Sequence, residues 1–232
     1  MLYTEEAVKA NIRSREGKRV FFLGKNDNLT SAARDYLSRE RIEIRPAQSA
    51  RPERFPLLGG GYCEEKPEHM THLDGVTLAP KTHPRIIFRG KLDTLEANLI
   101  LCRLFVPQFD RELKDILGYV RLLLRCEVLG EPVPEQKICG LTEQELRQHS
   151  HFPQDYYNQP HFMPESEDGR EIAILNLARC AAREAELAAA AAFTDGYGQV
   201  SRADLLRACN RLSSAVYLLM IRQRAARNEG TP

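Results

Sequence analysis

Residues 169–187 read GREIAILNLARCAAREAEL, and the rest of the chain is interpreted outward from this stretch. Alanine and leucine, both strong helix formers, make up much of it. Asn176, Arg179, Arg183 and Glu186 recur at intervals of three and four residues, so on a helix they form one polar stripe. The stripe is either a solvated face, which is the commoner case for such side chains, or the wall of a binding cleft.

Three more long helices are predicted around this one. Apolar stripes with helical spacing indicate one helix over residues 85–107 and a second from about 110 to 130. A third runs from about 201 to 224. The turn at 194–200 is short enough to make it an antiparallel neighbour of the 169–187 helix.

Capping signals mark where two helices begin. Thr142 and Glu145 form a capping box that predicts a short helix ahead of a segment broken by prolines. Asp168-Gly169-Arg170-Glu171 predicts a second box at the start of the 169–187 helix. Four long amphipathic helices and a short one predict an all-α bundle from about residue 68 onward.

The N-terminal part of the chain has a different pattern. Residues 1–46 predict a small α/β unit with helices near 5–12 and 30–37 and short strands near 20–23 and 42–44. Residues 47–68 are rich in proline and glycine, which is typical of a linker. We therefore expect three parts, covering residues 1–46, 47–68 and 69–232.

Composition excludes several classes of protein. The 232 residues are 43% hydrophobic and 28% charged with a formal net charge of +1, so neither a nucleic-acid-binding surface nor a membrane-binding tail is expected. No apolar run approaches the ~20 residues of a membrane span. The N-terminus lacks the apolar core of a signal sequence. Six scattered cysteines with no C-x-x-C pair indicate a reducing cytoplasm.

Common catalytic and metal-binding motifs are missing from the sequence. It has no nucleophile elbow, no P-loop and no dinucleotide-binding glycine pattern. Cys63, His69 and His72 have a spacing that lacks an obvious fourth ligand and matches no standard zinc site. We therefore predict that these residues bind no metal, and we assign no metal ligands from the sequence.

The polar stripe is the strongest candidate for a binding site. Arg179 and Arg183 lie one turn apart, and the neighbouring antiparallel helix offers Asn210 and Ser213. Two guanidinium groups so placed suit an anionic ligand such as a polyphosphate. Alternatively, Arg183 and Glu186 simply pair within a solvated face.

Asp93 is a second candidate, because it lies beside the apolar stripe of its helix rather than opposite it. It could pair with Arg89 one turn away on the same helix. It could instead hold Arg179 across a helix or subunit interface and present the guanidinium to a phosphate.

Several blocks of sequence, spread over nearly the whole chain in one order, resemble the corrinoid (cobalamin) adenosyltransferases, most closely those of the ethanolamine-utilisation type. The blocks are Lys81-x-x-Pro84-Arg85-x-x-Phe88-Arg89-x-x-Leu92-Asp93, Leu129-Gly130-Glu131-Pro132, Gly140-Leu141, Ser150-His151-x-Pro153, Gly169-Arg170, Arg179-x-x-x-Arg183-Glu184-x-Glu186 and Asn210-Arg211-Leu212-Ser213-Ser214-x-Val216-Tyr217.

The resemblance implies an ATP-dependent enzyme that transfers the 5′-deoxyadenosyl group of ATP to cobalamin and releases triphosphate. In that family the corrinoid loses its lower axial ligand and is reduced to cob(I)alamin, whose cobalt attacks C5′. The protein then needs no nucleophile of its own, and its tasks are to orient the substrates and to stabilise the leaving group.

The resemblance also implies roles for individual residues. Asp93 matches the aspartate that pairs with the first family arginine, here Arg179, and Arg183 matches the second arginine, a phosphate ligand. Three further motif positions, together with Lys81 on the nucleotide side, complete the expected ATP contacts: Arg85, Asn210 and Ser213.

The assembly and surroundings are implied in the same way. The related PduO-type enzymes are five-helix bundles assembled as trimers with ATP at the subunit interfaces, so we expect a five-helix bundle in a homo-oligomer. An electron donor or reductase is an expected partner, as are proteins of an ethanolamine-degrading microcompartment. A non-catalytic corrinoid-binding or microcompartment scaffold module is the alternative.

Three departures from the family pattern affect these expectations. The glycine-rich nucleotide loop T-K-T-G-D-x-G survives only as residues 71–77, and Glu96 replaces a family asparagine. Many relatives of the ethanolamine type have an upstream histidine and C-C-x-x-C, whereas this chain has Cys63 alone and no histidine before His69. We therefore predict no bound transition metal, with Mg²⁺ accompanying ATP.

Overall fold

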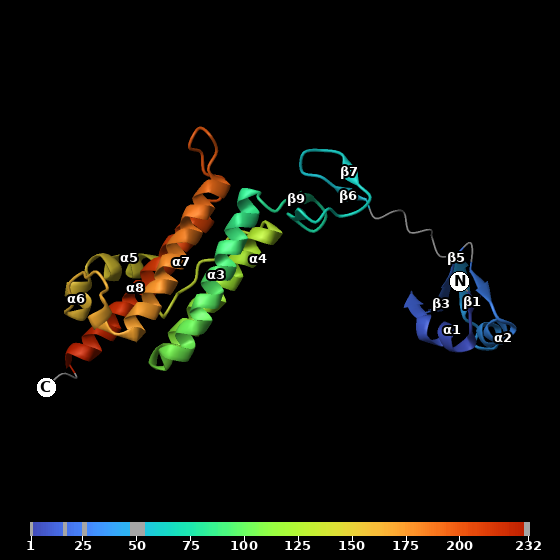
Figure 1. Cartoon of the computed structure of the whole chain (residues 1–232), viewed down its shortest axis with the longest axis horizontal. Helices are drawn as coiled ribbons and strands as arrows, with labels where there is room; N and C mark the ends of the chain where they lie inside the picture. Colours follow the sequence, from blue (N-terminus) through green and yellow to red (C-terminus); the bar gives the residue numbers. More distant parts are fainter. Residues whose placement is uncertain (1, 16–17, 25–26, 47–53, 230–232) are drawn as a thin grey trace. The chain divides into compact units, whose positions relative to one another are not determined.

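A computed structural model describes residues 2–15, 18–24, 27–46 and 54–229 of the chain. The chain divides into two compact units, residues 1–66 and 67–232, and each is described by itself. Helices dominate, with small pieces of strand, as the sequence predicted (Figure 1). Residues 47–53 of the predicted linker lie outside the described ranges.

The N-terminal unit is an α/β arrangement of short elements. Helices α1 (Glu5–Asn11) and α2 (Ser31–Arg39) begin at Thr4 and Thr30, whose hydroxyls accept a hydrogen bond from the third backbone N–H that follows. Strand β3 (Lys18–Leu23) pairs antiparallel with β2 (Arg13–Arg15) and parallel with β5 (Glu43–Pro46). A parallel pair, β1 (Leu2–Tyr3) with β4 (Asn28–Leu29), and a core that includes Val8, Phe21, Ala33 and Leu37 complete it.

Two short hairpins that the sequence did not predict follow. Strands β6 (Phe55–Pro56) and β7 (Tyr62–Cys63) pair within the stretch predicted to be a linker. Strands β8 (Met70–His72) and β9 (Leu78–Pro80) pair just before the long helices. The Asp74 carboxylate accepts the backbone N–H groups of Val76 and Thr77 at 3.0 and 2.7 Å, which closes the turn and lowers the pKa of Asp74. These local side-chain bonds, rather than apolar periodicity, specify the hairpin.

The second unit contains the long helices that the sequence predicted, with ends shifted by a few residues. None of the helices in the described part of the chain is long and apolar enough to cross a membrane. The helices are α3 (Pro84–Phe105), α4 (Asp110–Leu129), α5 (Glu143–His151), α6 (Pro153–Tyr157), α7 (Arg170–Phe193) and α8 (Ala203–Glu229).

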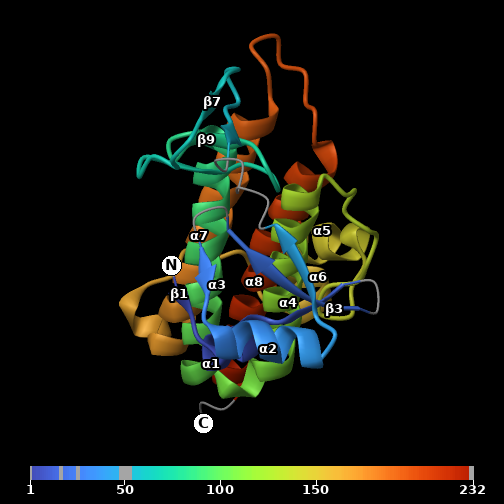
Figure 2. The same cartoon turned by 90° about the vertical axis from the view of Figure 1, so that its right-hand side faces the viewer.

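Helix α7 lies between α3 and α8 and runs antiparallel to both (Figures 1 and 2). Phe88 near the start of α3 packs edge-on against Phe193 at the end of α7, and the Cys102 thiol donates to the carbonyl of Ile174 at 3.4 Å. Small side chains permit this close packing, because α7 buries Ala178, Ala181, Ala182, Ala185 and Ala189. The helix with the polar stripe is therefore central to the unit.

The capping box at Thr142 and Glu145 is confirmed, whereas the one predicted at the start of α7 is wrong. The residue before α7 is Gly169, whose φ of 89° turns the chain, and no side chain caps the helix. Because of that turn, the Asp168 carboxylate bonds back to the N–H of Glu165 at 2.9 Å and belongs to the preceding 3₁₀ turn.

Asp204 joins the start of α8 to the loop after α4. Its carboxylate accepts two hydrogen bonds of 2.9 Å from Arg202 and one of 3.0 Å from the N–H of Val133. The Arg202 guanidinium lowers the pKa of Asp204 from 3.8 to about 2. A depressed pKa contributes stability that is present above the unfolded value and is lost as pH falls through the folded value.

Asp204→Asn is therefore expected to lower the free energy of unfolding at pH 7 by about 2 kcal/mol. The difference between wild type and variant should shrink as pH falls from about 4 to about 2. Urea denaturation at a series of pH values measures it. A difference that stays constant through this range would contradict the assigned ion pair.

Candidate functional site

The polar stripe of α7 faces α8 and is not a uniformly solvated surface. Arg179 is partly buried and donates from Nε to the Asn176 side-chain oxygen at 3.0 Å. Glu186, also partly buried, accepts a hydrogen bond of 2.6 Å from the Asn210 amide on α8. Arg183 is exposed and makes no ion pair with any residue that the structure describes, so the suggested pair with Glu186 does not form.

A cavity of about 250 Å³ lies between α5, α7 and α8. It brings together Arg179 and Arg183 of the stripe with Ser213, one of the two residues predicted on α8. The lining also includes Ser150, His151 and Tyr217. Ser213 donates its hydroxyl to the Asn210 carbonyl at 2.9 Å, which leaves its oxygen as an acceptor. The cavity thus combines two guanidinium groups with hydroxyls.

Two further cavities are lined by residues of α8 on either side of this one in the sequence. One of about 500 Å³ is lined by residues that include Asn210, Glu186, Arg147, Arg207 and Arg211. The other, of about 330 Å³, shares Arg179 and Tyr217 with the middle cavity and adds Phe162, Met163 and Pro164. We call the three together the α8 groove, which runs from a cationic end near Arg207 to an apolar end at Tyr217.

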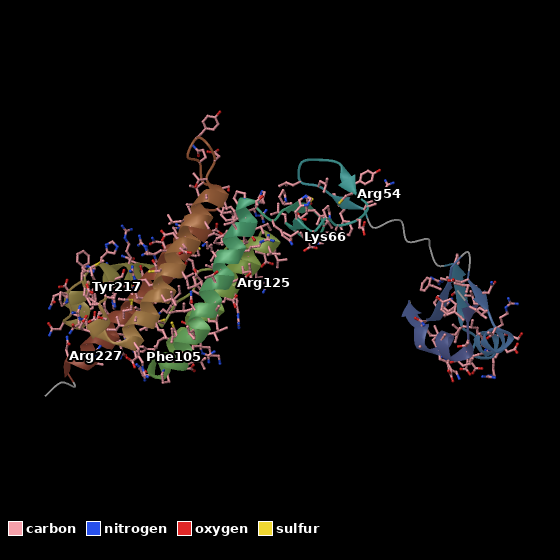
Figure 3. The ribbon with its side chains drawn as sticks, in the orientation of Figure 1. Arg54, Lys66, Phe105, Arg125, Tyr217 and Arg227 are labelled. Carbon is pink, nitrogen blue, oxygen red and sulfur yellow. The ribbon has the colours of Figure 1, made fainter. Side chains whose placement is uncertain are left out.

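The apolar end is built by a strap, residues 158–165, fastened to α8 at Tyr217. His161 stacks on the Tyr217 ring, and its Nδ1 lies 3.0 Å from the tyrosine hydroxyl. The N–H of Phe162 also donates to that hydroxyl at 3.4 Å. Figure 3 shows Tyr217 on α8 in the part of the unit that holds α5 and α6. Met163 remains 81% exposed, so this end offers apolar surface to a ligand.

Lys81 and Arg85 do not line the α8 groove. Lys81 pairs with Glu68 at 3.2 Å, and Arg85 pairs with Glu127 of α4, a carboxylate with 0% exposure. Arg89 binds the other oxygen of the same carboxylate and donates to the carbonyls of His72 and Leu73. This cluster around the buried Glu127 fixes the loop between β8 and β9 against α3.

The proposed intrahelical pair between Arg89 and Asp93 is wrong, because Arg89 is occupied by Glu127. Asp93 is exposed on α3 and has no ion-pair partner within the described residues. It does not pair with Arg179 within one chain. Lys91 of α3 instead meets Glu184 of α7 at 2.7 Å, which places Asp93 nearer to that level of α7 than to Arg179.

Several side chains of the groove were missed from the sequence, among them Arg147, Arg207, Arg211 and His161. Spacing could have indicated those on α8, since Arg207, Asn210, Ser214 and Tyr217 recur at intervals of three and four residues. Arg147 and His161 come from short elements whose packing on α8 no periodicity predicts.

No metal site is evident in the ranges that the structure covers, where no three histidine, cysteine, aspartate or glutamate side chains converge. Cys63 donates its thiol to the carbonyl of Phe55 at 3.8 Å within the β6–β7 hairpin. The absence of a bound transition metal stays a prediction.

Comparison with known proteins adds independent information. The sequence model of the family described as cobalamin adenosyltransferase matches residues 61–223. The protein named corrinoid adenosyltransferase EutT of Escherichia coli K12 is 32% identical over 242 aligned positions, which cover 94% of this chain and 90% of the relative. The protein of the same name from Salmonella typhimurium LT2 is also 32% identical with the same coverage.

Proposed function

Because the chain belongs to the cobalamin adenosyltransferase family, we propose that the α8 groove is the site of its reaction. The protein is a corrinoid adenosyltransferase of the ethanolamine-utilisation type, which moves the 5′-deoxyadenosyl group of ATP to the cobalt of cobalamin and releases triphosphate. The observation that carries the site is the single cavity lined by Arg179, Arg183 and Ser213. It adjoins an apolar end suited to the face of a corrinoid.

The reaction requires the protein to position the substrates and to supply positive charge, rather than to supply a nucleophile. Cobalt supplies the attacking electron pair, and the bond from C5′ to the triphosphate oxygen breaks as negative charge collects on the leaving group. Arg183 pairs with no carboxylate in the described part of the chain, so its guanidinium is available to that charge. Arg179, oriented by Asn176, and Ser213 contact the same group, while Asn210 is held by Glu186.

Mg²⁺ is proposed to accompany ATP. Magnesium keeps several waters and takes one or two carboxylates together with substrate phosphates. Glu186 fits this role, because only its Oε1 accepts a hydrogen bond in the described part of the chain and its carboxylate borders the cationic cavity.

A homo-oligomer is proposed to complete the site, with a trimer as the expected form. Lys81, Arg85 and Asp93 are expected ATP-site residues, yet one chain keeps them out of the α8 groove. Helix α3, which carries Asp93, also has exposed apolar side chains, and α7 adds Leu177 and Leu187. Those of α3 are Ile87, Ile100, Leu101 and Leu104. Such a surface suits a second copy, whose Arg179 would meet Asp93.

Asp93→Asn is expected to raise KM for ATP at least about tenfold while folding is retained, because it removes one partner of an interfacial charge pair. Steady-state kinetics and thermal denaturation measure the two properties. Thr94→Ser, the neighbouring exposed position, serves as the control. A normal KM and rate in Asp93→Asn would exclude the pairing.

The finer architecture and setting are part of the same proposal. Helices α3, α4, α5, α7 and α8 make a five-helix bundle within residues 69–232, preceded by a linker at 47–68 and the α/β unit at 1–46. The six cysteines are all free thiols, which suits the reducing cytoplasm. An electron donor that reduces the corrinoid and proteins of an ethanolamine-degrading microcompartment are the proposed partners.

A non-catalytic corrinoid-binding or scaffold module is the second candidate. It is favoured by the reduced nucleotide loop and by Arg85 and Arg89, both already paired with Glu127. Incubating the protein with ATP and chemically reduced cobalamin separates the two. Formation of adenosylcobalamin, seen in the absorption spectrum, together with triphosphate supports the enzyme. Corrinoid binding without either product would identify the module.

A further inference from the structure

The arginines at the cationic end of the α8 groove have no assigned role. We call this end the arginine cavity, after Arg147 of α5 and Arg207 and Arg211 of α8, which line about 500 Å³ of space with Asn210 and Glu186. It follows directly on the cavity of Arg183 and Ser213, since Asn210 and Ser213 are one turn apart on α8.

Arg211 is the residue that points to a ligand here. Its Nε and Nη1 atoms are buried and have no hydrogen-bond partner in the part of the chain that the structure describes. Only Nη2 is engaged, with the Asn210 side-chain oxygen. Buried polar atoms nearly always have a partner, and an unpaired charged group is costly. Burial accordingly lowers the pKa of Arg211.

The guanidinium groups of the other two arginines are also available to a ligand. Arg147 and Arg207 are exposed, and within the described ranges neither takes part in an ion pair. Two carboxylates border the cavity, Glu143 and Glu186, and one oxygen of the second accepts a hydrogen bond from the Asn210 amide. Together with Arg179 and Arg183, five arginines therefore face two carboxylates along the groove. The side chains that line the groove therefore carry an excess of positive charge.

We propose that the arginine cavity is a phosphate-binding subsite in which Arg147, Arg207 and Arg211 contact phosphate oxygens, an inference that rests on the proposed adenosyl transfer. Arginine forks match phosphate oxygens, and such oxygens would supply acceptors for Nε and Nη1 of Arg211 once its side chain turns toward the cavity. From Ser213 to Arg207 the rise along α8 is about 9 Å, a distance over which a triphosphate chain can continue from Arg183.

Two parts of the substrates carry such phosphates. One is the triphosphate of ATP, which leaves after transfer. The other is the phosphodiester in the nucleotide tail of cobalamin, which cobinamide, a corrinoid that lacks this tail, does not have. Both offer the same anionic oxygens, so the experiment has one arm for each.

Direct binding tests the subsite without catalysis. Inorganic tripolyphosphate is titrated into the full chain by isothermal calorimetry, and the double variant Arg147→Gln/Arg207→Gln is compared with Arg111→Gln. Arg111 is an exposed arginine of α4 outside the groove, and its variant, which removes one positive charge where the double variant removes two, serves as the control for charge lost elsewhere. We expect the double variant to bind at least about tenfold more weakly than wild type and the control to match it. Equal affinity in the double variant counts against the triphosphate arm.

Kinetics of the same variants identify the source. A raised KM for ATP, or weaker product inhibition by triphosphate, assigns the cavity to the triphosphate. A raised KM for cobalamin with an unchanged KM for cobinamide assigns it to the phosphodiester. If binding and all three KM values are unchanged in the double variant and in Arg211→Gln, the subsite does not exist.

The subsite and the proposed function can fail separately. An active wild-type enzyme whose arginine variants behave normally would retain the function and lose the subsite. A protein that forms no adenosylcobalamin but binds tripolyphosphate through Arg147 and Arg207 would keep the anion site and lose the function.

Discussion

Replacing Arg183 with alanine is expected to slow adenosyl transfer by about 10²-fold, the loss that follows removal of one preorganised donor to a developing oxyanion. The reason is geometric. Arg183 lines the middle cavity beside Ser213, and its guanidinium is not neutralised by any described carboxylate. As the C5′–oxygen bond breaks, the leaving triphosphate gains charge that this guanidinium would stabilise. The initial rate of adenosylcobalamin formation at saturating ATP measures the effect.

Controls separate this role from a loss of structure. Arg183 is exposed, so the variant should keep the wild-type melting temperature. Arg111→Gln removes an equivalent exposed charge outside the groove and should leave the rate unchanged. Since Arg183 is proposed to act mainly in the transition state, kcat should fall more than KM rises. An Arg183→Ala enzyme with normal turnover would remove Arg183 from the mechanism.

Glu127→Ala is expected to lower the free energy of unfolding by about 3–5 kcal/mol, because it leaves two partly buried cations without their fully buried carboxylate. Glu127 has 0% exposure, while the paired side chains of Arg85 and Arg89 are 28% and 15% exposed. Each guanidinium binds one of its oxygens. Urea denaturation followed by circular dichroism measures the loss.

Glu131→Ala is the matched comparison. Glu131 forms an ion pair of 3.4 Å with Arg125, and their side chains are 45% and 64% exposed, respectively. Removing such an exposed pair changes the free energy of unfolding by at most about 1 kcal/mol. Equal losses in the two variants would mean that burial of the Glu127 cluster has no energetic consequence. The Glu127 variant should also release the loop at His72 and Leu73, since Arg89 loses its orientation.

The long helices could be predicted because each has an apolar stripe that only a helix aligns. The stripe of Phe88, Leu92, Leu95, Leu99 and Cys102 is fully buried in α3. The β8–β9 hairpin could not be predicted from periodicity, since it depends on the Asp74 carboxylate and on a few residues of pairing. The capping box predicted at Asp168 does not form, because Gly169, with its positive φ, changes the direction of the chain before the helix begins.

Of the site, only the part formed by the neighbouring helices α7 and α8 could be predicted from the sequence. Spacing and a short turn were enough to bring Arg179, Arg183 and Ser213 to one cavity. The Glu127 cluster joins residues about forty positions apart, which no local pattern indicates. Arg179 was proposed as the partner of Asp93 from the family resemblance rather than from a local pattern, and within one chain the two do not pair.

The alanine face of α7 limits how far the site can move. Alanine has no side-chain torsion to freeze, so packing this face costs no rotamer entropy and leaves no alternative rotamers that could let the helix slide. Ala178, Ala182, Ala185 and Ala189 are all 0% exposed. Enlarging one of them would push the backbone away from its neighbours. Arg179 and Arg183, on the other side of the same helix, would move with the backbone. The rigid packing of the buried alanine face therefore fixes where their guanidinium groups point.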